Sequence, residues 1–224
     1  MSIEIIPAIM PDTFDDLRTK LALVQGATRN VQIDVMDGIF VLGKTWPYSG
    51  RGKELFSDIV RGNQGFPFWE DFDFEADFMV DRPELVIADW VRAGIARAII
   101  HIESRHDFSA CLRATGDAVD VGVAINTTTP LSRLDTYIGA AAFVQFMGIA
   151  TIGRQGELFD ERVLAHISSF KQAHPDVTIQ VDGGVSAETI PLLKSVGVTR
   201  FAVGSAILRA EDPKQMIREL KHIA

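Results

Sequence analysis

Two aspartates stand near the ends of β-rich runs, where a strand of a parallel barrel can carry chemistry. Asp34 lies in the run 31–37, and Asp182 stands directly before the glycine pair Gly183 and Gly184. One carboxylate can remove a proton from carbon while a second returns it, provided that each is near its working protonation state. We expect Asp34 and Asp182 to lie on the catalytic face of the barrel. The competing interpretation is a pair of buried structural acids.

More polar side chains share the faces of these runs. Successive side chains of a strand point to opposite faces, so residues two apart lie together. This alternation groups Gln32, Asp34 and Met36 in one run, and Glu75, Asp77 and Met79 in the run 72–80. Asp37 points the other way, and we expect it to cap the turn at Gly38.

Glycines follow the last two β-rich runs and predict an anion site. Gly183 and Gly184 allow backbone amides to approach a ligand, and the eighth run ends with Gly204, Ser205 and Ala206. In barrels of this type a phosphate is held after strands seven and eight. The chain has a formal net charge of -8, so an anionic ligand must be bound by such local groups.

These positions require eight strands, each followed by a helical segment, closed into a barrel. The fold expected is therefore α/β, a (β/α)8 TIM barrel, with residues 1–224 as one domain. The β-rich runs are 3–10, 31–37, 72–80, 97–104, 121–127, 143–149, 178–184 and 200–206. Ser186 and Asp212, the latter followed by Pro213, are the expected helix starts in the last quarter of the chain.

The longest irregular stretch, residues 38–71, is rich in glycine and aromatic residues. A short helix is expected at 53–61. Because the stretch follows a strand, it belongs on the catalytic face. A lid over the site and a packed cover or dimer contact are equally good interpretations.

Composition excludes several classes of partner. The acidic charge disfavours nucleic acid and anionic membranes, and no apolar run reaches membrane-spanning length. The single cysteine, Cys111, fits a buried structural thiol in a reducing compartment, so we expect a cytoplasmic protein. The oligomeric state stays open, a homo-oligomer included.

Several motifs together resemble the ribulose-phosphate 3-epimerase family over nearly the whole chain. They are Asp34-Val35-Met36-Asp37-Gly38, His101-Ile102-Glu103, Gly122-Val123-Ala124-Ile125-Asn126, Val181-Asp182-Gly183-Gly184 and Gly204-Ser205-Ala206. The resemblance implies a (β/α)8 TIM barrel of the ribulose-phosphate-binding type. It also implies an isomerase acting on a small phosphorylated sugar, in which two aspartates invert C3 through an enediolate. It assigns these roles to Asp34 and Asp182. It places Met36, Met79, Met147 and His101 with Gly183, Gly184, Gly204 and Ser205 among the substrate-binding residues.

The sequence departs from the family at the metal site. Members bind a divalent metal through two histidines and the two aspartates, but Gln32 and Asp77 stand at the histidine positions. The set Gln32, Asp34, Asp77 and Asp182 suits Mg²⁺ or Mn²⁺ better than zinc. The alternative is that no metal is used and that His101 or Lys44 polarises the substrate. Ala8 also replaces the family's serine after the first proline, and Arg154 lies in a divergent loop where it could contact the phosphate.

Two other functions remain open. One is a related barrel decarboxylase or aldolase, although the run 75–80 lacks the lysine of the Asp-x-Lys-x-x-Asp pattern. The other is a catalytically silent barrel that binds a sugar phosphate or a protein.

Overall fold

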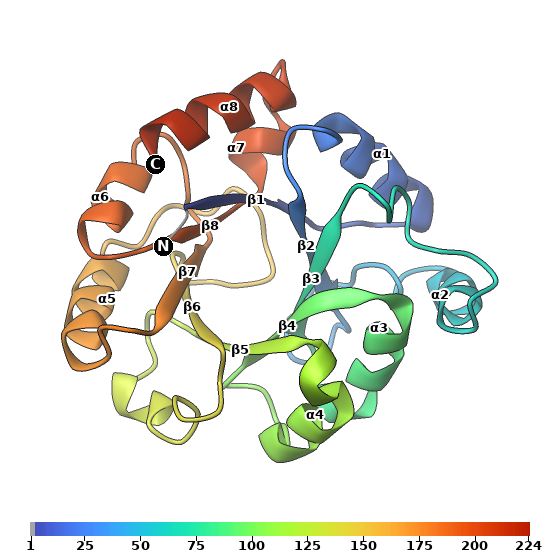
Figure 1. Ribbon diagram of the computed structural model, residues 1–224, viewed down its shortest axis with the longest axis horizontal. Helices are drawn as coiled ribbons and strands as arrows, with labels where there is room; N and C mark the ends of the chain where they lie inside the picture. The colour runs from blue at the N-terminus through green and yellow to red at the C-terminus, as the bar shows by residue number, and fades with distance from the viewer. Residues whose placement is uncertain (1–2) are drawn as a thin grey trace.

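The computed structural model describes residues 3–224, so the first two residues of the expected 1–224 domain lie outside the described part. Eight parallel strands pair in chain order, and β8 returns to β1 to close the barrel (Figure 1). This confirms the (β/α)8 TIM barrel predicted from the sequence. The strands are β1 (Glu4–Ile9), β2 (Asn30–Met36), β3 (Asp73–Met79), β4 (Ile95–His101), β5 (Asp120–Ile125), β6 (Phe143–Met147), β7 (Thr178–Asp182) and β8 (Arg200–Val203).

The helices form an outer ring around the strands (Figure 1). They are α1 (Phe14–Val24), α2 (Gly52–Val60), α3 (Ile87–Ala93), α4 (Phe108–Thr115), α5 (Arg162–Ala173), α6 (Ile190–Ser195), α7 (Ser205–Leu208) and α8 (Pro213–Ile223). Short 3-10 turns occupy Pro83–Leu85, Gly116–Ala118 and Leu131–Leu134. The last of these is the only helical turn between β5 and β6.

One of the two predicted helix starts is correct. Asp212 caps α8, since its carboxylate accepts a hydrogen bond from the amide of Gln215 at 2.9 Å. Ser186 does not start a helix, because its hydroxyl and that of Thr189 fold the segment into a turn first. The helix begins at Ile190, and Pro191 occupies its first turn, where a missing amide hydrogen costs little.

The two faces of the strands differ in chemistry. Side chains that point outward toward the helices are apolar, as Val31, Ile33 and Val35 are on β2. Several side chains that point into the barrel are polar and buried, including Gln32, Glu75, Gln145 and Gln180. Burying such groups is costly unless they are hydrogen-bonded, so the barrel interior must contain an organised polar network.

The long segment 38–71 is mainly a packed cover. Trp46 is fully buried and its ring packs 5.5 Å from that of Phe56 on α2 and 6.1 Å from that of Phe66. Helix α2 agrees closely with the helix predicted at 53–61. Asp37 caps the following turn as expected, accepting from the amide of Ile39 at 2.7 Å. Ile39 and Leu42 near the start of the segment and Trp69 near its end are strongly exposed.

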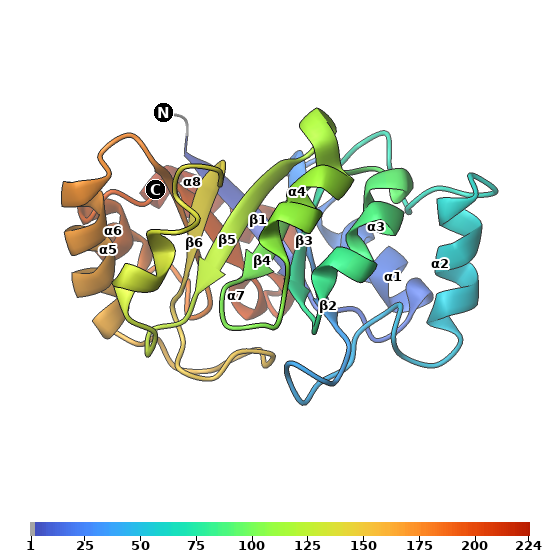
Figure 2. The ribbon, with the colours of Figure 1, turned by 90° about the horizontal axis from the view of Figure 1, so that it is seen from below.

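Figure 2 shows the loops that follow β2 and β6 at the same end of the barrel. These loops contact each other, because Phe40–Gly43 and Ala150–Arg154 line one shallow depression. Away from this end, Cys111 is buried on α4, and desolvation raises the pKa of its thiol to about 12. Within residues 3–224, none of the helices has the length and apolar character needed to cross a bilayer.

Candidate active site

Three aspartates from three strands meet inside the barrel. Asp34 on β2 lies opposite Asp77 on β3 in the strand register, and Asp182 ends β7. Their carboxylates offer oxygens that all lie within 4.8 Å of one another. Asp77 is fully buried and Asp34 is 5% exposed, whereas Asp182 is half-buried.

Gln32 joins two of these acids. Its amide nitrogen donates to Oδ1 of Asp34 at 2.8 Å and to Oδ2 of Asp182 at 2.9 Å. Thr45 fixes the backbone beside them, since its hydroxyl donates to the carbonyl oxygen of Asp34 at 2.6 Å and accepts from the amide of Met36. The acid pair is therefore held by both a side chain and the start of the long segment after β2.

Burial and mutual repulsion perturb this pair. Desolvation, followed by the charges of Asp182 and Asp77, raises the pKa of Asp34 well above its usual range. Desolvation and the charge of Asp77 likewise raise the pKa of Asp182 to about 7, although the Gln32 hydrogen bond opposes this rise. Each carboxylate therefore favours its protonated form more than a free aspartate does.

Asp77 has its own supporting partners. His101 Nε2 lies 3.0 Å from Oδ1 of Asp77, and the amide nitrogen of Gln145 donates to Oδ2 at 3.1 Å. Desolvation lowers the pKa of His101, but attraction to Asp77 outweighs it and the net direction is upward. Both side chains thus supply hydrogens to the third carboxylate from outside the cluster.

The donor set of the cluster fits a hard divalent cation. Three carboxylates without a histidine or thiolate are the oxygen ligands that Mg²⁺ and Mn²⁺ prefer. Gln32 was expected to complete this set, but in the structure it turns its amide hydrogens toward Asp34 and Asp182. His101 contacts Asp77 from behind, as groups that orient metal ligands commonly do.

A cavity of about 290 Å³ opens above the acids at the carboxyl ends of the strands. Asp34 and Asp182 border it, together with Met79 and Met147. Ala8 also borders it, so the hydroxyl that the family's serine would contribute is missing from this wall. The structure thus brings two of the three predicted methionines to the cavity.

The remaining predicted residues lie farther from the cavity. Met36 is buried in a small cluster with Val41 and Met79. His101 is fully buried beneath Phe40, whose ring centroid lies 5.6 Å from its own. Lys44 packs across Gly38 and is exposed. Neither His101 nor Lys44 is among the cavity-lining residues of the described part of the chain.

The glycine-rich corner forms one end of the cavity. Gly183, Gly184, Gly204 and Ser205 all line it. Gly184 has a φ of +66°, and a Cβ there would come within 2.8 Å of Cα of Phe159. A Cβ on Gly204 would come within 2.9 Å of Nε2 of Gln155. At Gly184 the positive φ and the close backbone of Phe159 require glycine, as expected where backbone approaches an anion.

Arg154 provides the only cationic side chain among the cavity-lining residues of the described chain. It is exposed and lies in the loop after β6, next to Gln155, whose amide donates to the carbonyl oxygen of Ala8 at 3.3 Å. The rest of any phosphate charge must therefore be met by backbone amides.

Sequence reasoning missed the polar residues below the acids. Gln145 and Gln180 are fully buried and bonded to each other at 2.9 Å. The signal was present, because each stands two residues before a residue that lines the cavity, Met147 and Asp182 respectively. The same alternation that selected Gln32 would have selected both.

Comparison with known proteins supports a family assignment. A family model described as the ribulose-phosphate 3 epimerase family matches residues 4–208. Ribulose-phosphate 3-epimerase of Aquifex aeolicus is 28% identical over 207 residues, which cover 90% of this chain and 87% of that protein. Ribulose-phosphate 3-epimerase of Bacillus subtilis is 27% identical over 226 residues and 98% of each chain.

Solved structures extend the likeness of fold. KGPDC from Streptococcus mutans superposes with a TM-score of 0.70 at 14% identity, covering 100% of this chain and 97% of that one. 3-Hexulose-6-phosphate synthase from Salmonella typhimurium also gives 0.70, at 18% identity and with 99% and 98% coverage. At these identities the superpositions show the barrel fold alone. The family match spans nearly all of the described strands and helices, and this chain therefore belongs to the ribulose-phosphate 3-epimerase family.

Proposed function

We propose that this protein is an epimerase of a ketose phosphate, with Asp34 and Asp182 as acid and base. The observation that carries the proposal is the pair of carboxylates bridged by Gln32 at the floor of a cavity whose far end is a glycine corner. Family membership points to the same chemistry.

The cavity suits a short phosphorylated sugar. Its glycine corner, Gly183, Gly184, Gly204 and Ser205, presents backbone to the phosphate, with Arg154 at the rim. Anchoring the phosphate there directs the carbonyl end of the substrate toward Asp34 and Asp182. Such positioning supplies much of the rate enhancement in enzymes of this type.

The proton transfers follow from the two acids. One carboxylate takes the proton from C3, and the C3–H electron pair forms the C2–C3 double bond as negative charge moves to the carbonyl oxygen. The other carboxyl group then protonates C3 on the opposite face, which inverts its configuration and regenerates the carbonyl. With the pKa of Asp182 at about 7 and that of Asp34 also raised, one member can be protonated and the other ionised at neutral pH.

Asp34, Asp77 and Asp182 would hold Mg²⁺ or Mn²⁺, and a bound cation would stabilise the enediolate oxygens. The alternative donors expected from the sequence, His101 and Lys44, lie away from the cavity wall. This placement favours the three-carboxylate cation site over a metal-free mechanism that relies on either side chain.

Solvent exchange tests the proposal directly. The protein is incubated with ribulose 5-phosphate and related ketose phosphates in D₂O, with EDTA or with Mn²⁺, and deuterium at C3 is followed by proton NMR. We expect exchange, and we expect Asp34→Asn to reduce it by about 10²–10⁴-fold, the usual contribution of a general acid or base. Asp73→Asn is the matched control, because Asp73 pairs with Arg29 in an exposed position at the start of β3.

Absence of exchange with every ketose phosphate would refute the epimerase. Calorimetric binding of the same esters, unchanged in Asp34→Asn, would then identify a silent phosphate-binding barrel. A decarboxylase or aldolase has no support from the site, because no lysine borders the cavity within residues 3–224.

A further inference from the structure

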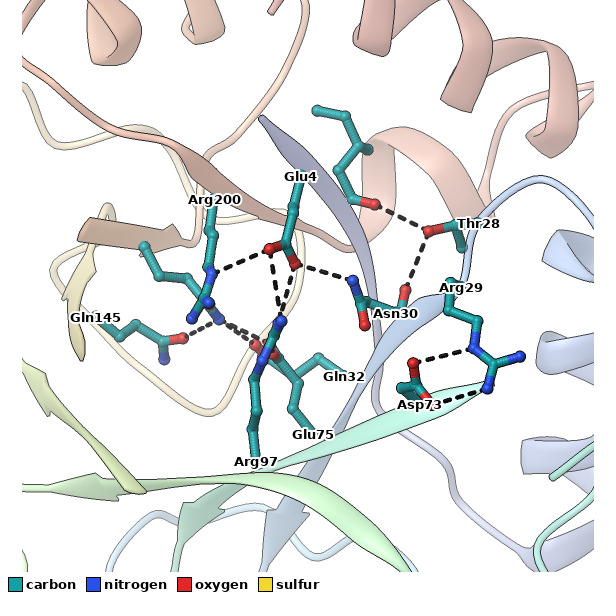
Figure 3. A network of polar contacts seen from close by, with 12 residues as sticks. Glu4, Thr28, Arg29, Asn30, Gln32, Asp73, Glu75, Arg97, Gln145 and Arg200 are labelled. Atoms are coloured by element: carbon teal, nitrogen blue, oxygen red, sulfur yellow. Dashed lines mark hydrogen bonds and ion pairs between the residues drawn. The ribbon is translucent and has the colours of Figure 1, made fainter. Parts of the chain in front are cut away.

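A buried network of amides lies directly below the three aspartates. Gln32, Gln145 and Gln180 point inward from β2, β6 and β7, and all three side chains are fully buried. Figure 3 shows the network continuing through Glu75 to Arg97, Glu4 and Arg200. Polar side chains thus extend from the amino-terminal end of the barrel to the acids.

Gln180 is the centre of this network. Its amide nitrogen lies 2.7 Å from Oε1 of Glu75, 2.9 Å from Oε1 of Gln145 and 3.3 Å from Oε1 of Gln32, so its two hydrogens are shared among three acceptors. Its own amide oxygen is buried without a partner among the described residues. A buried unsatisfied oxygen is costly, and an apolar side chain would fill the space without it. The hydrogen bonds that the Gln180 amide donates must therefore be what offsets the cost of burying it.

Charged groups at both ends fix the direction of the hydrogen bonds. Arg97, which can only donate, bonds Oε2 of Glu75 at 3.3 Å, so Glu75 presents its other oxygen to Gln180 as an acceptor. At the opposite end the amide nitrogen of Gln145 donates to Asp77. Gln145 must then turn its carbonyl oxygen toward Gln180. If the side-chain amide of Gln32, Gln145 or Gln180 rotated by half a turn, two donors or two acceptors would face each other.

The same constraint reaches the acid pair through Gln32. Its carbonyl oxygen accepts from Gln180, so its two hydrogens face Asp34 and Asp182. If the Gln32 amide rotated by half a turn, its oxygen would face the carboxylates of Asp34 and Asp182, and its nitrogen would face the amide nitrogen of Gln180. We propose that Gln180 is a positioning residue that holds the Gln32 amide as a hydrogen-bond donor to both acids. The expected effect of Gln180 on catalysis rests on the proposed function. The expected orientation of the Gln32 amide does not.

Two substitutions at the centre of the network test this role. Gln180→Met removes the hydrogens at similar volume, and Gln180→Glu replaces the donor with an acceptor. We expect both to lower kcat for C3 exchange by about 10–100-fold, as losses of supporting contacts to site ligands do, with KM changed by less than about 3-fold. Thr115→Val is the matched control, because Thr115 is buried and bonded only within α4.

A second measurement needs no turnover. The side-chain amide protons of Gln32 are assigned in ¹⁵N NMR by their loss in Gln32→Met, and their exchange with solvent is measured in each variant. We expect Gln180→Met to speed this exchange by at least about 10-fold, since the amide loses its fixed orientation. Thr115→Val should leave both the kinetics and the exchange rate at wild-type values.

The outcomes separate the two proposals. Unchanged kcat and unchanged Gln32 exchange in Gln180→Met would overturn the positioning role. If the Gln180 variants do not fold, wild-type kcat in Gln32→Met would overturn it equally. If the wild-type protein exchanges no ketose phosphate, the epimerase proposal fails, and the Gln32 amide measurement alone decides whether Gln180 sets its orientation.

Discussion

Replacing Asp182 by asparagine should abolish catalysis and stabilise the fold. Desolvation, with the charge of Asp77, raises the pKa of Asp182 from 3.8 to about 7 in the folded protein. Each pKa unit corresponds to 1.36 kcal/mol, so holding this carboxylate ionised costs up to about 4 kcal/mol. Its side chain borders the open cavity, and solvent there reduces the cost, so we expect Asp182→Asn to gain about 2–4 kcal/mol at pH 8.

The sign of the pH dependence is the critical part of this prediction. The pKa of Asp182 is higher in the folded than in the unfolded protein, so its ionised form lowers the free energy of unfolding of the wild-type protein above pH 7. This loss of stability shrinks as the pH falls and Asp182 takes up a proton. The advantage of Asp182→Asn should therefore be largest at pH 8–9 and shrink toward pH 5. Urea unfolding followed by circular dichroism in EDTA measures both proteins across this range.

A matched aspartate gives the opposite expectation. Arg105 bonds Asp81 through both oxygens and lowers the pKa of that carboxyl group, so Asp81→Asn should lose stability at pH 8. If Asp182→Asn is no more stable than wild type at pH 8, or if its advantage does not shrink on acidification, the site does not hold a desolvated carboxylate at this position.

Three further predictions address the cavity and the acid cluster. Arg154→Ala should raise KM for a ketose phosphate by about 3–10-fold with little change in kcat in steady-state assays, because an exposed guanidinium contributes only modestly. Gly184→Ala should lower the free energy of unfolding by about 2–4 kcal/mol in urea titrations, against about 1–2 kcal/mol for Gly62→Ala. Both glycines have a positive φ, but only at Gly184 would the new Cβ also clash with Phe159. Mn²⁺ should raise the Tm of the wild-type protein at pH 8 more than at pH 6, since protons compete for the carboxylates as the pH falls below about 7; equal shifts would contradict a cation at the acids.

The fold and the positions of the acids were predictable because they depend on local alternation. The pattern of Gln32, Asp34 and Met36 defines an inward face wherever that strand lies, and eight such runs leave few architectures. The predicted strands extended too far at their carboxyl ends in several cases. The runs ending at Ser104 and Ala206, for example, include residues that turn away over the barrel mouth. Strand pairing ends at His101 and Val203, before these residues.

Side-chain direction beyond the strand was not predictable. Met36 shares a face with Asp34 yet packs against Val41, because the loop after β2 folds back over it. His101 ends a strand as predicted but bonds Asp77 from behind and does not border the cavity. Gln32 was taken as an oxygen ligand, and which end of an amide faces a carboxylate depends on partners 100 or more residues away, here Gln180 at a separation of 148. Sequence spacing carries no information on such contacts.

The two departures from the family's metal site are chemically linked in this structure. Asp77 brings a third carboxylate beside Asp34 and Asp182, and Gln145 and His101 both bond it. Gln32 cannot replace a neutral histidine as a ligand while it donates to two acids. It instead stabilises their ionised forms. Compared with two histidines and two aspartates, a cation held here would have one more anionic ligand and two fewer neutral ones, a change that favours a hard cation over zinc.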